Sequence, residues 1–303
     1  MAKKSRRNFE AKPDSNRQAK LAARAAEREE LAGNPRPFAG VVGECDIVAM
    51  QQFVPSATAK VDLAGVEHPV YLSTVLPGAI AALTRAIPSG TESFVGLQTA
   101  AYGLAPERDL AASLAWVAKS EAGDTLQAAE PSDEDPELAE LLKGNESLEV
   151  TVHDNFAWWA AEGAEVHPQI AQAIQHANGA MMPSARIDTP GADAAWWVDA
   201  GERAHIRWVR PEDEDALFDA MARLHNRGEL TLGEGSSFAG SFRTTGLLVP
   251  VFDLDNTKPA DHWTDGLATL DAKFTEALAE SGELSSDERA SRNGLRARQV
   301  TLR

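Results

Sequence analysis

Polar and apolar residues alternate strictly in several short segments of the chain. Between these segments, apolar residues recur at the spacing of an α-helix. His205 and Arg207 alternate with Ile206 and Trp208, which predicts a half-buried β-strand. Farther along, apolar residues recur at helical spacing from Leu217 to Leu224, which predicts a helix with one buried face. Segments of both kinds follow one another. We therefore expect an α/β protein of the α+β type, with mainly antiparallel sheets flanked by helices.

Proline and glycine mark the ends of the expected helices. Pro106-Glu107 and Pro211-Glu212 each open a helix, because proline is tolerated in the first turn and acids there complement the helix macrodipole. Gly228 is placed to close the second helix in the left-handed conformation. A last helix is expected from Trp263 to Leu278. Pro250 lacks a backbone donor, so its strand is expected at a sheet edge or a bulge.

A weak internal repeat appears at an offset of 126 residues. Residues 59–62 (Ala-Lys-Val-Asp) align with residues 185–188 (Ala-Arg-Ile-Asp), and each copy continues through a second apolar run to a Pro-Glu helix start. Two pseudo-repeated halves would pair and share one core. On this hypothesis Asp62 superposes near Asp188, and the strand order is the same in both halves. Chance similarity of two amphipathic segments is the alternative.

The predicted organisation has four parts. They are a disordered basic tail (1–38), a first half-repeat that ends in an acidic linker (39–146, with the linker at 124–146), a second half-repeat with the closing helix (147–284) and a basic C-terminal segment (285–303). The tail has too few large apolar side chains to offset the entropy of ordering it.

Net charge divides the chain. Residues 1–24 carry eight Lys and Arg against two acids, and residues 289–303 carry five Arg and no acid, so the net −17 leaves −28 on the body between them. A mobile basic segment attracts polyanions such as nucleic acid or a ribosome, through Lys3, Lys4, Arg6 and Arg7 in particular. The alternative is that the basic ends fold back onto the acidic body.

Several classes of protein are excluded or disfavoured by what the sequence lacks. The single Cys45 cannot form an internal disulfide, the basic N-terminus is followed by no apolar signal region, and no window approaches a membrane span, so we expect a cytoplasmic protein. No phosphate loop, zinc motif, nucleophile elbow or dinucleotide fingerprint occurs. We predict neither a cofactor nor a metal site.

His205 and Arg207 share one face of their strand, where imidazole beside guanidinium could bind an anion. Glu202 could orient the histidine as a general base. A solvated outer sheet face is the plainer interpretation. Asp253 begins an Asp-x-Asp pair able to hold a divalent cation, although a turn at Asp255 is favoured.

Candidate residues of two kinds remain. The catalytic candidates are His205, Glu202, Glu234 and Asp253, and the further binding candidates are Arg207, Arg243 and Trp197. Trp196 and Trp197 are adjacent on an expected strand, so one should be in the core and the other outside or at the seam between the halves. An exposed tryptophan would be a candidate contact for a partner. The glycine-rich residues 233–237 are expected to form a flexible turn.

Four strings are similar to those of an actinobacterial family of unknown function. They begin at Cys45 (Cys-Asp-Ile-Val-Ala-Met), Glu202 (Glu-Arg-Ala-His-Ile-Arg-Trp-Val), Leu232 (Leu-Gly-Glu-Gly) and Phe242 (Phe-Arg, with Gly246-Leu-Leu-Val-Pro-Val-Phe-Asp-Leu after it). The resemblance covers most of residues 38–256 and implies no activity and no catalytic residue. Members sometimes carry automated labels of preprotein translocase ATPase or topoisomerase, and the missing phosphate loop and the short length contradict both labels.

Two hypotheses of function follow. The leading one is a non-enzymatic cytoplasmic binding or adaptor protein with a tryptophan-bearing groove, whose basic ends contact an anionic macromolecule. The alternative is a small-molecule hydrolase or transferase that uses His205 and carboxylates. If His205, Glu234, Arg243 and Asp253 converge in one pocket, the enzyme is favoured.

Overall fold

The computed structural model describes residues 34–101, 103–161, 163 and 165–301. Residues 36–303 form one unit, which contains every element described below. Lys3, Lys4, Arg6 and Arg7, together with the predicted tail as far as residue 33, lie outside the described residues. In the described part of the chain, no helix has the length and apolar character that crossing a membrane requires.

Runs of strands are separated by helices along this unit. The helices are α2 (Glu44–Gln52), α3 (Pro106–Val117), α4 (Leu138–Leu142), α5 (Pro168–Ala180), α6 (Glu214–Asn226), α7 (Thr264–Ala279) and α8 (Ser286–Arg296). The strands are β1 (Ala57–Val61), β2 (Val70–Ser73), β3 (Ala82–Ile87), β4 (Gly90–Gly96), β5 (Thr125–Leu126), β6 (Glu149–Val152), β7 (Ser184–Thr189), β8 (Ala192–Asp199), β9 (Ala204–Trp208), β10 (Ser236–Thr244), β11 (Leu247–Leu254) and β12 (Gln299–Thr301).

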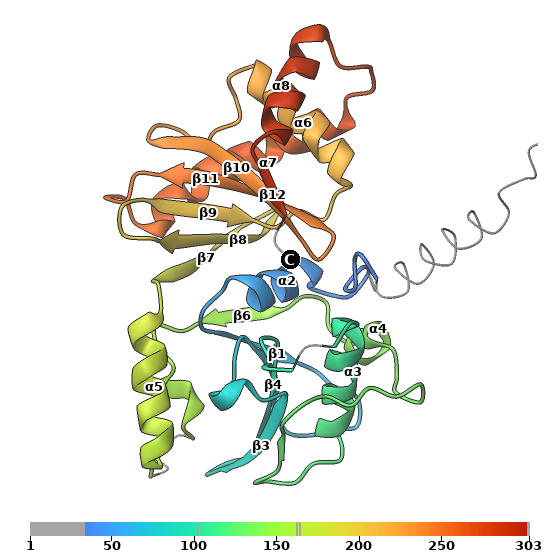
Figure 1. The fold of residues 1–303 in the computed structure, drawn as a ribbon, viewed down its shortest axis with the longest axis vertical. Coiled ribbons are helices and arrows are strands. Elements are labelled where there is room, and N and C mark those ends of the chain that lie inside the picture. Colours follow the sequence, from blue (N-terminus) through green and yellow to red (C-terminus); the bar gives the residue numbers. More distant parts are fainter. Residues whose placement is uncertain (1–33, 102, 162, 164, 302–303) are drawn as a thin grey trace, which may run out of the picture. The chain divides into compact units, whose positions relative to one another are not determined.

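The strands form two six-stranded sheets, one in each half of the chain (Figure 1). The first sheet has the order β5-β3-β4-β2-β1-β6, and the second has the order β12-β10-β11-β9-β8-β7. Most neighbours are antiparallel, but β2 runs parallel to β4 and β10 runs parallel to β12. The predicted α+β class with two sheet halves is confirmed.

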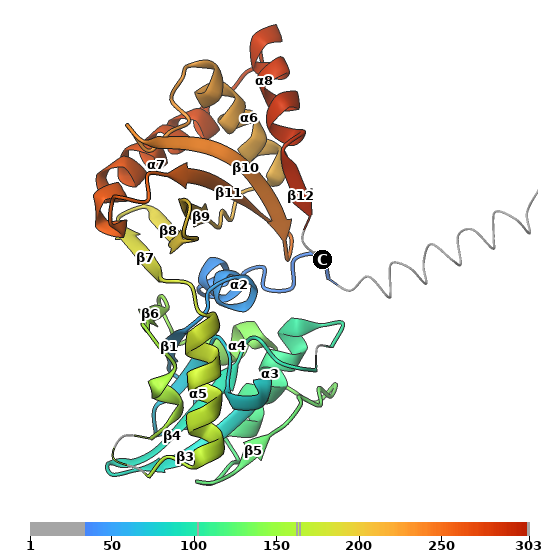
Figure 2. The same ribbon diagram turned by 60° about the vertical axis from the view of Figure 1, so that its left-hand side comes forward.

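Helix α2 lies between the two sheets (Figures 1 and 2). Its consecutive residues Ile47–Met50 are all buried, and they belong to a core that contains residues of both sheets, among them Leu72 and Trp196. Helices α3 and α4 complete this core on the first sheet. The opposite face of the second sheet packs against α6 and α7 in a second core. Each face of the second sheet is therefore covered over part of its area.

The expected helix signals are confirmed with small shifts. Helix α3 begins at Pro106 as predicted, while α6 begins two residues after Glu212 because Asp213 caps it and accepts hydrogen bonds from the backbone of Asp215 and Ala216. Gly228 follows α6 with a φ of +71°, which is the left-handed conformation expected there. Helix α7 covers the predicted closing helix.

The repeat holds for the first two strands and fails at the third. β1 and β7 each pair antiparallel with the strand that follows. The next predicted equivalents differ, because β4 runs parallel to β2 whereas β9 runs antiparallel to β8, and β3 is inserted in the first half. The equivalent strands β1-β2-β4 and β7-β8-β9 are therefore neighbours in the same order, but the direction of the third strand differs. The duplication remains a hypothesis.

Three expected boundaries also change. Phe38 is buried, so packing begins before residue 39. The linker contributes strand β5 and two buried leucines, Leu138 and Leu142, so it is part of the first half rather than an exposed connection. β6, placed in the second half by the boundary at residue 147, pairs with β1 in the first sheet.

The strand that contains Pro250 is not at an edge, because β11 lies between β10 and β9. The ladder to β9 ends at Val251, and the next bridge joins Leu248 to Arg210. Pro250 falls between these two contacts, where a missing backbone donor does no harm.

The basic C-terminal segment folds back onto acidic helix α6. Arg292 binds Asp215 at 2.9 Å and Asp219 at 2.5 Å, and Arg296 also pairs with Asp215. Two of the five arginines expected to make this end basic are thus neutralised by acids of α6. Arg298 has no ion pair or side-chain hydrogen bond among the described residues.

Candidate functional site

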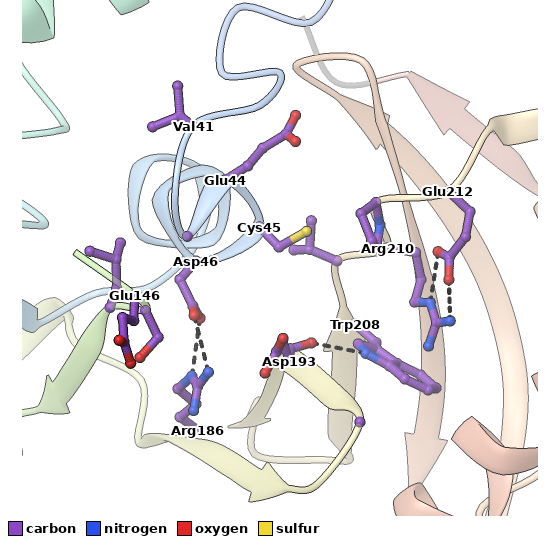
Figure 3. Close-up of a pocket in the computed structure, with 16 residues that line it drawn as sticks. Val41, Glu44, Cys45, Asp46, Glu146, Arg186, Asp193, Trp208, Arg210 and Glu212 are labelled. Carbon is purple, nitrogen blue, oxygen red and sulfur yellow. Dashed lines mark hydrogen bonds and ion pairs between the residues drawn. The ribbon is translucent and has the colours of Figure 1, made fainter. Parts of the chain in front are cut away.

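Three cavities of the structure could serve as functional sites. The first, which we call the α2 pocket, lies where α2 meets the second sheet and has a volume of about 360 Å³ (Figure 3). Its charged groups are mostly paired within the protein. Arg186 of β7 donates two hydrogen bonds of 3.0 Å to Asp46, and Arg210 binds Glu212 and, at 2.8 Å, Asp271.

These pairs give the α2 pocket a structural role. Burial raises the pKa of Asp46, while the hydrogen bonds from Arg186 oppose that shift. Burial, followed by the neighbouring acids, raises the pKa of the Cys45 thiol to about 12, so this thiol is protonated at neutral pH and is a poor nucleophile. Across the part of the chain that the structure describes, no group of three or more His, Cys, Asp and Glu could hold a metal ion.

The second cavity lies on the face of the second sheet that α2 leaves partly uncovered, and we call it the second-sheet groove. It has a volume of about 530 Å³. The residues that define it are Phe53, His205, Arg207, Ser241, Phe242, Asp253 and Arg298. They come from the end of α2, from three neighbouring strands and from the turn before β12.

Strand pairing accounts for this collection. The two-residue period of β9 directs His205 and Arg207 to the groove and buries Ile206 and Trp208. Register then places Asp253 opposite His205. A Cβ at Gly240 would lie 2.9 Å from the backbone oxygen of Arg298, so glycine there permits the chain at β12 to approach β10 closely.

His205 and Asp253 form a hydrogen-bonded pair. The Nδ1 atom of His205 lies 3.0 Å from Oδ1 of Asp253, and Arg203 binds the other carboxylate oxygen at 2.5 Å. The carboxylate therefore orients the imidazole and is itself neutralised by Arg203. This geometry is suitable for a general base or for a polar contact with a ligand.

The side chain of Arg207 has neither an ion pair nor a hydrogen bond among the described residues. Its guanidinium carbon lies 5.4 Å from the centre of the Phe53 ring, and burial lowers the pKa of this arginine. Ser241 also borders the groove, but its side chain points to the α6 face of the sheet, because it lies opposite Gln299, whose side chain binds Glu214 of α6. Arg298 adds a second arginine without an ion pair. A cationic cluster with unused donors is suited to an anion.

The remaining predicted residues lie elsewhere. Glu202 and Glu234 are exposed in turns and do not line the groove, and Arg243 pairs with Glu214 at 3.2 Å. The four residues proposed to converge thus separate into a pair in the groove, His205 and Asp253, and two outside it. Asp255 accepts hydrogen bonds from the backbone and hydroxyl of Thr257, as expected for a turn.

The tryptophans follow the predicted alternation. Trp196 is 2% exposed in the core around α2, where both halves meet, and Trp197 is half-buried against the helices on the other face. Neither lines the second-sheet groove. Trp208 lines the α2 pocket, and Trp158 lines a third cavity, on the first sheet.

Sequence reasoning missed three residues of the second-sheet groove, namely Phe53, Phe242 and Arg298. Alternation along β10 would not have been a sufficient signal, because the register shifts between Phe238 and Gly240. Phe238 therefore packs against the second core, whereas Phe242 packs against the first.

The fold and this groove define a class of protein: a two-sheet α+β protein with an arginine-containing groove in its second half. More particularly, the chain belongs to the family of unknown function DUF5926, whose family model matches residues 37–303. The comparisons with curated proteins and with solved structures gave no match.

Proposed function

We propose that this chain is a non-enzymatic binding protein and that its second-sheet groove holds a phosphate group of an anionic partner, a single-stranded nucleic acid. The observation that carries the proposal is the half-buried guanidinium of Arg207, which has no ion pair or hydrogen bond among the described residues. Burying a cation without a partner is unfavourable, and a phosphate would offset that cost through charge-assisted hydrogen bonds.

The charge distribution restricts the partner. With a body of net −28 between its basic ends, the protein repels a long polyanion except where cations gather. The groove brings together Arg207, Arg298 and the oriented His205, which suffices for one or two phosphates rather than for a duplex. Lys3, Lys4, Arg6 and Arg7 would add a separate, sequence-independent attraction.

Binding of a fluorescently labelled 12-nucleotide single-stranded RNA, followed by anisotropy, tests the proposal. We expect Arg207→Ala to weaken binding about tenfold or more, in line with the loss of a charge-assisted contact to phosphate. Arg207→Lys should recover part of the affinity. Arg227→Ala is the matched control, because this arginine pairs with Glu280 and does not line the groove.

The salt dependence of binding supplies a second measurement. The logarithm of the affinity should fall with the logarithm of the salt concentration, with a slope of about −0.7 for each phosphate neutralised, and Arg207→Ala should reduce that slope. Replacement of the four tail residues by alanine should reduce the slope further. Undiminished affinity in Arg207→Ala would refute the groove as the phosphate contact.

A hydrolase is the second candidate, and the 3.0 Å contact of His205 with Asp253 favours it. In such an enzyme the imidazole would take a proton from an attacking water while Asp253 holds the ring in place. Turnover of bis(4-nitrophenyl) phosphate separates the candidates. A binding protein shows no turnover that His205→Ala abolishes.

A further inference from the structure

The third cavity lies on the outer face of the first sheet and shares no lining residue with the second-sheet groove. We call it the first-sheet groove, and its volume is about 950 Å³. The residues that the argument uses are Thr58, Tyr71, Arg85, Phe94, His153 and Trp158. Register places Tyr71 opposite Phe94 on β2 and β4, with Thr58 on β1 beside them.

Four rings form a continuous aromatic wall in this groove. The ring centres of Tyr71 and Phe94 are 5.1 Å apart with nearly parallel planes, Phe94 and Trp158 are 5.7 Å apart, and Trp158 and His153 are 5.6 Å apart. Phe94 is 5% exposed and forms the floor, whereas Tyr71, Trp158 and His153 are half-buried and line the cavity. Aromatic surface is therefore presented to a ligand.

The wall is held in place by hydrogen bonds. The indole Nε1 of Trp158 donates to Ser56, and Arg85 donates to the carbonyl oxygens of Trp158 and Trp159 at 3.0 and 2.7 Å. His153 lies 2.9 Å from the hydroxyl of Thr58 through its Nε2 atom, so its Nδ1 atom is left for other contacts. An aromatic surface that is ordered before binding loses little entropy when a ligand stacks on it.

The charges of this groove cancel. Arg85 lies over the Phe94 ring and is paired with Glu92 at 2.7 Å. Burial lowers the pKa of His153, with Asp154 opposing the shift, so the imidazole is neutral at neutral pH. Thr58, Thr151 and Ser89 contribute uncharged hydroxyls to the lining. The described residues of this groove therefore offer no unpaired cation to a phosphate. A neutral planar ring needs no such cation in order to bind.

We propose that the first-sheet groove binds a nucleobase, stacked on Tyr71 and Trp158. Base–aromatic stacking is the mode by which sheet surfaces bind single-stranded nucleic acid, and it tolerates every base because each has a π face. The proposal is independent of Arg207, since a nucleoside carries the base without the phosphate. The base could belong to a free nucleoside or to a strand, and the experiment separates these sources.

Calorimetric titration of the full chain with adenosine, guanosine, cytidine and uridine tests the proposal. We expect saturable binding of at least one nucleoside. Tyr71→Leu should weaken it at least fivefold by removing a stacking ring, while Tyr71→Phe keeps the ring and should leave the affinity within about twofold. Trp158→Leu is the second variant. Trp116→Phe, on α3 and outside this groove, is the matched control.

The source of the base is tested with the Arg207→Ala chain. If the base belongs to a strand, a six-nucleotide RNA should bind this variant more tightly than the nucleoside does, and Tyr71→Leu should weaken both. If the ligand is a free nucleoside, the nucleoside should bind at least as tightly as the RNA. Equal nucleoside affinity in wild type and Tyr71→Leu would overturn the proposal. So would the absence of nucleoside binding together with binding of a decaproline peptide that Tyr71→Leu abolishes, because proline-rich segments are the other ligands of aromatic grooves.

Discussion

Arginines in the second half differ in what neutralises them. Arg186 is bound by Asp46, Arg210 by Glu212 and Asp271, and Arg223 donates to the backbone oxygens of Ala277 and Gly282. Arg207 is half-buried, and its guanidinium contacts the Phe53 ring instead of an anion. A half-buried guanidinium without an anionic partner among the described residues is stronger evidence that the second-sheet groove is a binding site than the volume of the cavity is.

His153 gives a prediction at the same scale. Because burial lowers its pKa below the ordinary value of 6.5, the unfolded chain takes up a proton before the folded one as the pH falls. The contribution of the neutral His153 to the free energy of unfolding is therefore fully present above pH 6.5 and is lost as the pH falls through the lower pKa of the folded state. We expect the melting temperature of wild type to drop more between pH 7.5 and 5.5 than that of His153→Gln.

The matched control is His225→Gln, an exposed histidine near Ser291 that lies outside the first-sheet groove. It should leave the acid sensitivity of wild type unchanged. An equal fall in melting temperature for wild type and His153→Gln would show that this histidine does not contribute to it.

Helix α2 is the element that joins the two sheets, but its sequence pattern does not reveal it as a helix. A helix with one buried face shows helical periodicity, but residues 47–50 are all buried because sheets cover α2 from more than one side. The sequence pattern therefore predicts no amphipathic helix at this position. The bound partner of α2 in the second half is Arg186, whose hydrogen bonds to Asp46 span 140 positions of sequence.

This pair gives a prediction for the element. Asp46→Leu should destabilise the fold by about 2–3 kcal/mol, because it leaves the mostly buried Arg186 with only the exposed Asp188 as an ion-pair partner among the described residues. The double variant Asp46→Leu/Arg186→Met should recover much of that loss, since apolar groups of similar size often replace a buried pair at little cost. Urea denaturation measures both.

The single variant Arg186→Met completes a double-mutant cycle. If the loss of stability in the double variant equals the sum of the two single losses, Asp46 and Arg186 are not coupled, and this pair does not hold α2 to the second half.

For the whole molecule, the packed chain starts earlier than the sequence predicted, within the segment assigned to the tail. Phe38 is 1% exposed, and Arg36 donates two hydrogen bonds to Glu44 at the start of α2. A chain that begins at residue 39 should therefore be less stable than one that begins at residue 34 by about 3 kcal/mol or more, the usual cost of losing a buried phenylalanine.

Urea denaturation of the two truncated chains checks this prediction, with Phe38→Ala in the full-length chain as an internal comparison. We expect Phe38→Ala to account for most of the difference. Equal stability of the two truncated chains would contradict the packed position of Phe38.

Local signals settled much of the secondary structure before any tertiary contact was considered. Proline at the start of α3, glycine after α6 and the alternation of β9 act within a few residues, so the sequence alone predicted these elements and the pairing of polar residues His205 and Arg207 on one face. The alternation also predicted that Trp196 and Trp197 point to opposite faces of β8.

Tertiary structure alone decided which of these residues form sites. The second-sheet groove joins Phe53 to β9, β10 and Arg298, and the first-sheet groove joins Tyr71 to Trp158. Strand register and chain direction bring such distant residues together, and the reversal of the third strand between the halves shows that similar local patterns permit either direction. The reason is physical: alternation specifies which face a side chain takes, whereas the neighbour it meets depends on pairing with strands many residues away.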